Sequence, residues 1–99
     1  MKVKHTAFGE EFTLIPRITT YSNGDNAIVL YDEVDGLSFC KASISIEGLE
    51  SDEVAIKNYS ENAGILESLI RAEIITKPHR YTNQGHVEIP ICKLLINPA

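Results

Sequence analysis

One segment of the chain has the apolar spacing of an amphipathic helix, and strand-like segments flank it on both sides. Four aliphatic side chains recur there at helical spacing and form one apolar stripe: Ile65, Leu66, Leu69 and Ile70. We predict a helix over residues 61–73, and Pro78 prevents any continuation beyond it. A single helix among strands has to bury its stripe against a sheet, which restricts the fold class before composition is considered.

The polar residues 58–62 lie directly before this helix. Asn58 or Ser60 can accept a hydrogen bond from a free N–H of the first turn, and Asn58 with Glu61 resembles a capping box. A catalytic role would need a general base nearby, and the three histidines are all distant in the sequence: His5, His79 and His86. We therefore interpret residues 58–62 as the start of the helix. Gly64 is unusual inside a helix; we expect it to allow close approach of the sheet, with room for a ligand as the alternative.

Alternating and continuous apolar patterns predict strands over most of the remaining chain. The predicted segments are residues 2–8, 11–20, 26–32, 37–47, 53–57, 79–82 and 86–96. Pro16 and Pro90 lack an N–H, so each should lie at a sheet edge, at a bulge or at a non-bonded position. The apolar residues of 37–47 change phase, which predicts a bulge near residue 39. We predict one α+β domain over residues 1–99: a mainly antiparallel sheet of about five or six strands with one helix packed on one face.

The formal net charge of −5 is unevenly distributed along the 99 residues. Residues 1–61 contain 11 acidic and 5 basic side chains, whereas residues 62–99 contain 3 and 4. The acidic side chains gather in predicted turns: Glu10 and Glu11; Asp32, Glu33 and Asp35; Glu47, Glu50, Asp52 and Glu53. Such clusters are typical of solvated loops; the alternative is an acidic patch that docks on a basic partner.

Residues 77–86 form the one locally basic segment and contain no acidic residue. Arg80 lies beside Tyr81, and an aromatic ring next to a guanidinium can stack on a nucleic-acid base. The chain as a whole lacks the basic face that phosphate binding requires. An exposed hairpin with solubilising charges is therefore the alternative interpretation of this segment.

Nothing in the sequence predicts an enzyme. The chain has no phosphate-binding, dinucleotide-binding, serine-hydrolase or zinc-protease motif. We expect no catalytic residues, no cofactor and no metal site, because His79 and His86 with Cys92 supply too few ligands. Cys40 and Cys92 lack CxxC spacing, so we expect free thiols. The start of the chain lacks the apolar stretch of a signal peptide and no segment reaches the length of a membrane span, so we expect a cytoplasmic protein.

Three stretches together resemble a known family: YSNGDNAIVLYDEVDG, IKNYSENAGILESLI and GHVEIPICKLL. The resemblance is to small uncharacterised proteins of Gram-positive bacteria and their conjugative elements, a family described only as a domain of unknown function. It covers roughly residues 10–96. It implies a bacterial cytoplasm and an accessory role on a mobile element, and it implies no activity or functional residue.

These observations predict a non-enzymatic protein-binding or accessory factor, such as a mobile-element inhibitor of a host nuclease or defence system. Carboxylates that imitate phosphates would bind the basic groove of such a nuclease. The alternative is a nucleic-acid-binding module acting through residues 77–86. The candidate binding residues under the two hypotheses are Lys77, His79, Arg80, Tyr81, Glu50, Asp52 and Glu53. We expect a protein partner and either a monomer or a dimer formed by pairing of edge strands.

Overall fold

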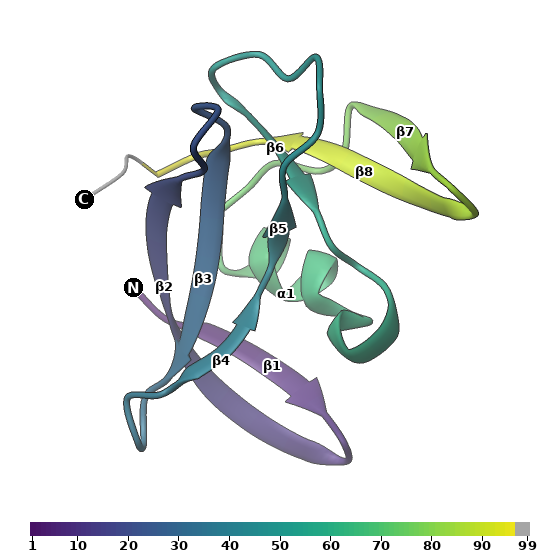
Figure 1. The fold of residues 1–99 in the computed structure, drawn as a ribbon. Coiled ribbons are helices and arrows are strands. Elements are labelled where there is room, and N and C mark those ends of the chain that lie inside the picture. Colours follow the sequence, from purple (N-terminus) through teal and green to yellow (C-terminus); the bar gives the residue numbers. More distant parts are fainter. Residues whose placement is uncertain (97–99) are drawn as a thin grey trace.

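The computed structural model describes residues 1–96 and contains antiparallel strands with one α-helix (Figure 1). The elements in chain order are β1 (Val3–Ala7), β2 (Glu10–Thr20), β3 (Asn26–Asp32), β4 (Ser38–Lys41), β5 (Ser43–Ile44), β6 (Glu53–Ile56), the 3₁₀ turn η1 (Ser60–Asn62), α1 (Ile65–Arg71), β7 (Arg80–Gln84) and β8 (Val87–Lys93). The predicted α+β class therefore holds at this coarse level, because strands precede and follow a single helix.

The strands form two four-stranded sheets, so the expectation of one sheet with five or six strands is wrong. One sheet has the order β1-β2-β3-β4 and the other the order β5-β6-β8-β7, and every named pairing is antiparallel. The predicted strand over residues 37–47 is divided at Ala42, where the chain passes from one sheet to the other. The Ala42 N–H donates to the Ile28 carbonyl, and the Ala42 carbonyl accepts from the Lys57 N–H, both at 2.8 Å. Ala42 therefore joins the two sheets at a corner.

The main core lies between the first sheet, α1 and part of the second sheet. It contains Val3, Leu14, Ile28 and Leu30 from the first sheet, Val54 and Ile56 from β6, and Ile65 and Leu69 from α1. A smaller cluster on the second sheet contains Ile46, Ala55, Ile89 and Ile91. Only half of the predicted α1 stripe is fully buried, because Leu66 and Ile70 remain partly exposed beside the core.

The predicted helix over residues 61–73 is shorter and interrupted. Gly64 has a φ of +90° and separates η1 from α1. A Cβ built at Gly64 would meet its nearest neighbour, the Cε1 atom of His5, at an ordinary contact distance of 3.7 Å. The glycine is therefore needed for its left-handed backbone. Neither close approach of the sheet nor space for a ligand explains it.

The helix cap is confirmed for Asn58 and is not made by Ser60. The Asn58 Oδ1 atom accepts from the Gly64 N–H at 3.1 Å and from the Leu66 N–H at 3.0 Å, so it satisfies two donors at the start of α1. Glu61 does not complete a capping box; its Oε1 atom accepts from Lys57 Nζ at 3.0 Å. Residues 58–62 therefore start the helix, as expected.

The prolines and the bulge occupy the positions that the sequence predicts. Phe39 is the extra residue of β4, since Leu30 lies opposite Cys40 and Tyr31 opposite Ser38. Pro16 lies beyond Leu14, the last β2 residue that pairs with β1. Pro90 lies just beyond the point where β8 stops pairing with β6.

Neither helical segment within residues 1–96 has the length and apolar character that a membrane crossing requires.

Candidate functional site

Glu53, the first residue of β6, connects the acidic loop before it to the basic residues that start β7. The Glu53 carboxylate accepts from Arg80 Nη2 at 2.7 Å and from Arg80 Nε at 3.0 Å, a bidentate arrangement. It also lies 2.5 Å from His79 Nε2 and accepts from the Glu50 N–H at 2.9 Å. The Glu53 side chain is only 4% exposed. Arg80 additionally donates to the Gly48 carbonyl at 3.1 Å.

These contacts keep Glu53 ionised at neutral pH and give it a structural role. The Arg80 hydrogen bonds hold the pKa of Glu53 far below its usual range, and the Glu50 N–H and His79 add to the effect against the opposing cost of burial. The same pairing raises the pKa of Arg80. A general base needs a free lone pair and a pKa near the working pH, and Glu53 has neither. Its role is to fix the loop before β6 to the start of β7.

The candidate binding residues divide into separate groups. Glu53, His79 and Arg80 form the cluster just described. Asp52 is exposed and lies 3.6 Å from Lys93 Nζ, and Glu50 is exposed in the neighbouring loop. Lys77 and Tyr81 instead line a different surface, next to α1. The acidic residues around Glu53 and the basic segment 77–86, which the sequence analysis treated separately, are therefore in direct contact through Glu53 and Arg80.

The acidic turns do not combine into one patch. Asn26 at the start of β3 contacts the loop before β6, since its Nδ2 atom donates to the Ser51 and Glu53 carbonyls at 3.0 Å. Asp32 ends the same strand six residues later, about 20 Å away at the rise of an extended chain. Figure 1 shows the β3–β4 turn and the loop before β6 at opposite ends of the molecule. Asp32 and Asp35 also accept backbone N–H bonds within their own turn, at 2.9 Å each.

A groove beside α1 combines apolar and charged side chains. We call it the α1 groove; it has a volume of about 600 Å³ and is lined by Leu66, Glu67, Ile70, Arg71, Lys77, Pro78 and Tyr81. Leu66 and Ile70 are the half of the apolar stripe that the core leaves partly exposed. Tyr81 is 55% exposed. Two cations and one carboxylate surround these apolar side chains.

Sequence reasoning identified Lys77 and Tyr81 but missed the helical side of this groove. A signal was present, because the aliphatic residues of α1 occur as adjacent pairs. Neighbours on a helix point about 100° apart, so Ile65 and Leu66 cannot both face the core. The same holds for Leu69 and Ile70. The sequence therefore contained an outer pair, Leu66 and Ile70, that the predicted packing did not need.

A buried histidine lies on the opposite side of α1. The Nδ1 atom of His5 in β1 is 2.8 Å from the Ser68 hydroxyl, which also donates to the Gly64 carbonyl at 3.2 Å. His5 is 2% exposed, Ser68 is 3% exposed, and His5 Nε2 has no hydrogen-bond partner within the described residues. Burial first, and the Arg71 charge second, lower the pKa of His5. With no opening to solvent, this pair attaches α1 to β1 and does not resemble an accessible nucleophile and base.

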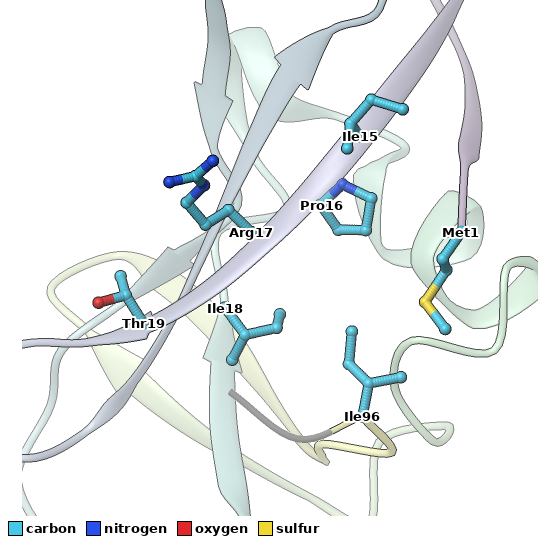
Figure 2. A pocket seen from close by; sticks show the side chains of 7 residues that line it. All are labelled: Met1, Ile15, Pro16, Arg17, Ile18, Thr19 and Ile96. Carbon is cyan, nitrogen blue, oxygen red and sulfur yellow. The ribbon is translucent and has the colours of Figure 1, made fainter. Parts of the chain in front are cut away.

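A second hollow lies against the part of β2 that β1 leaves unpaired (Figure 2). It has a volume of about 630 Å³ and is lined by Met1, Ile15, Pro16, Arg17, Ile18, Thr19 and Ile96. Figure 2 shows the side chains of Met1, Pro16, Ile18 and Ile96 around the hollow, whereas Arg17 and Thr19 project from the other side of β2. The hollow is therefore apolar apart from the free backbone groups of β2.

No group of three or more His, Cys, Asp or Glu side chains within residues 1–96 is arranged to hold a metal ion. Cys40 and Cys92 are free thiols, as expected, and burial raises their pKa values to about 11 and about 12. Neither thiol therefore has the lowered pKa of a reactive cysteine.

The fold and its surfaces define a small α+β domain with an apolar groove and an open strand edge. Comparison with protein-family models, with curated proteins and with solved structures finds no match for this chain. A functional assignment consequently has to come from the geometry of the two hollows and from the charges around them.

Proposed function

We propose that this protein is a non-enzymatic protein-binding module of the cytoplasm and that the α1 groove is its binding site. The observation that carries the proposal is the outward position of Leu66 and Ile70, with Pro78 and the half-exposed ring of Tyr81 beside them. A helix of seven residues in a small domain gains stability by burying apolar side chains. Two aliphatic side chains left at a groove are therefore available to a partner.

The charges around the groove favour an acidic partner segment. Arg71 and Lys77 are both exposed at its rim, and Glu67 is the one carboxylate there. A segment with one apolar anchor and nearby carboxylates would bury the anchor against Leu66 and Ile70 and place its charges near the two cations. Such complementarity raises the association rate and selects against basic partners.

This proposal differs from phosphate mimicry of a host nuclease substrate. A mimic needs carboxylates along one face, and the acidic turns lie at separate ends of the fold, with Glu53 neutralised by Arg80. An inhibitor or accessory factor that acts through the α1 groove is the form of the hypothesis that the geometry supports. Nucleic-acid binding through residues 77–86 has less support, because the Arg80 guanidinium is already bonded to Glu53 and Gly48.

The test is a selection of random peptides on the immobilised protein, followed by affinity measurements. We expect selected peptides to share an aliphatic or aromatic anchor with neighbouring acidic residues. Tyr81→Ala should weaken their binding by about tenfold or more, as removal of an interface aromatic typically does. Leu37→Ala is the matched control, because Leu37 is 66% exposed and lies in the distant β3–β4 turn.

Two outcomes would contradict the proposal. The first is a selection that enriches no peptide. The second is a set of peptides that bind Tyr81→Ala and the wild type equally. A mobility shift with single-stranded DNA or RNA that Arg80→Ala abolishes would instead favour the nucleic-acid-binding alternative.

A further inference from the structure

The second half of β2 has an open edge within the described residues. β1 pairs with β2 only from Glu10 to Leu14, whereas β3 pairs with β2 as far as Thr20. Residues 15–20 therefore have a strand on one side and the hollow of Figure 2 on the other. An edge of this kind offers free backbone groups to another strand.

The direction of the backbone groups follows from the pairing with β3. The Thr13 carbonyl accepts from the Glu33 N–H at 3.0 Å, so the backbone N–H and carbonyl groups of odd-numbered β2 residues point toward β3. Ile28 lies opposite Ile18. Its N–H donates to the Ser43 hydroxyl at 2.9 Å and its carbonyl accepts from the Ala42 N–H at 2.8 Å, so neither group bonds to Ile18. Ile18 therefore directs both of its backbone groups to the open edge.

The edge offers two donors and three acceptors. By the alternation of an antiparallel strand, Pro16, Ile18 and Thr20 face outward. Pro16 contributes a carbonyl and no N–H, whereas Ile18 and Thr20 contribute both groups. A proline usually discourages pairing at an edge. Here Pro16 also restricts the possible registers, because only some of them give every outward N–H of the strand a carbonyl to bond.

We propose that this edge pairs with the same edge of a second copy of the chain, antiparallel and centred on Ile18. In that register Ile18 lies opposite Ile18 of the second copy and exchanges two hydrogen bonds with it. Each Thr20 N–H meets a Pro16 carbonyl, so both donors of each chain are used. The second copy then covers the apolar hollow beside Ile18, while each Ile18 side chain stays in the core of its own chain.

Alternative registers fit less well. A pairing centred on Arg17 forms two backbone hydrogen bonds and places two Arg17 side chains opposite each other, which is unfavourable. A pairing centred on Thr19 forms four backbone hydrogen bonds between Ile18 and Thr20 of the two copies, but it places each Pro16 opposite Ser22, beyond the end of β2. That register also leaves the Pro16 end of the hollow uncovered. Centring on Ile18 places Arg17 opposite Thr19 and covers the hollow along its length.

The test is sedimentation equilibrium of the whole chain and of variants on the exposed face of β2. Thr19→Glu should tighten dimerisation by about threefold or more at low salt, because each new carboxylate lies opposite an Arg17. Thr19→Arg should weaken it by a similar factor. Ser38→Glu and Ser38→Arg are the matched controls, since Ser38 is exposed on β4 at the other edge of the same sheet.

Two further experiments test the backbone and the register. Pro16→Val supplies the missing N–H and should tighten the dimer about tenfold through two added hydrogen bonds. A mixture of Arg17→Cys and Thr19→Cys chains should form an intermolecular disulfide on mild oxidation, because the register places these two exposed residues opposite each other, while either variant alone should do so more slowly. The proposal is overturned if the wild type, Thr19→Glu and Pro16→Val all remain monomeric. It is equally overturned if Ser38 variants alter association as much as Thr19 variants do. Neither result would affect peptide binding at the α1 groove.

Discussion

The Glu53 carboxylate and the Arg80 guanidinium form two parallel hydrogen bonds, of 2.7 Å and 3.0 Å, between segments that are 27 residues apart. Glu53 is 4% exposed, whereas Arg80 is 44% exposed. The carboxylate therefore depends on Arg80 more than Arg80 depends on the carboxylate, since a free guanidinium can still reach water.

Arg80→Ala should reduce the free energy of unfolding by about 1–3 kcal/mol, because it leaves a buried carboxylate short of two charged hydrogen bonds. Arg80→Lys should recover only part of the loss, since a lysine cannot make the bidentate contact. Urea denaturation measures both. Asp52→Asn is the control: its pairing with Lys93 at 3.6 Å is exposed and should be worth less than about 1 kcal/mol. Equal losses at positions 80 and 52 would refute this role for Glu53.

Stability should fall with acid through two groups, beginning with His5 and continuing with Glu53 at lower pH. The pKa of His5 lies below its ordinary value of 6.5, so the unfolded chain takes up a proton that the folded chain does not, and stability falls as the pH drops from 6.5 toward the lowered pKa. The pKa of Glu53 is also lowered, so its contribution is complete above pH 4.5 and is lost as the pH falls below that value. Denaturation midpoints measured between pH 8 and pH 3 give this profile.

The first part of this decrease can be assigned to His5 by substitution. His5→Gln should remove the change in stability between pH 6.5 and pH 5 even if it lowers stability at every pH. His86→Gln is the matched control, because His86 is exposed in the β7–β8 turn. An unchanged pH profile in His5→Gln would show that His5 is not the group that titrates.

A substitution at the tip of the β1–β2 hairpin should increase the stability of the fold. Phe8 has a φ of +54°, is 83% exposed, and precedes Gly9 at a φ of +73°. A left-handed backbone costs a residue such as phenylalanine about 1 kcal/mol, and asparagine tolerates it better. Phe8→Asn should therefore raise the free energy of unfolding by up to about 1 kcal/mol. Gly9→Ala, which has open space around it but the same backbone requirement, should lower it.

Local patterns in the sequence predicted local structure well. The Asn58 cap, the bulge at Phe39 and the positions of both prolines follow from the properties of single residues. The division into two sheets did not follow, because it depends on Ala42 bonding to Ile28 on one side and to Lys57 on the other. Long-range partners of that kind leave no periodic signal in the sequence.

The candidate site shows the same limit. Charge composition identified Glu53 and Arg80 separately but gave no indication that they meet, because a net charge says nothing about distance. The groove was missed for another reason: the apolar stripe was treated as one surface, although the adjacent residues Leu69 and Ile70 point in different directions. Burial of one and exposure of the other is decided by which element packs against the helix.

The central claim is that Leu66 and Ile70 of α1 present a binding surface together with Tyr81. The most direct measurement is a heteronuclear NMR titration of the labelled chain with a peptide selected on it. We predict that the largest amide shifts lie in residues 65–71 and 77–81, and that Tyr81→Ala removes them. Shifts concentrated instead in the loop before β6, in residues 82–86 or along the open edge of β2 would contradict the claim.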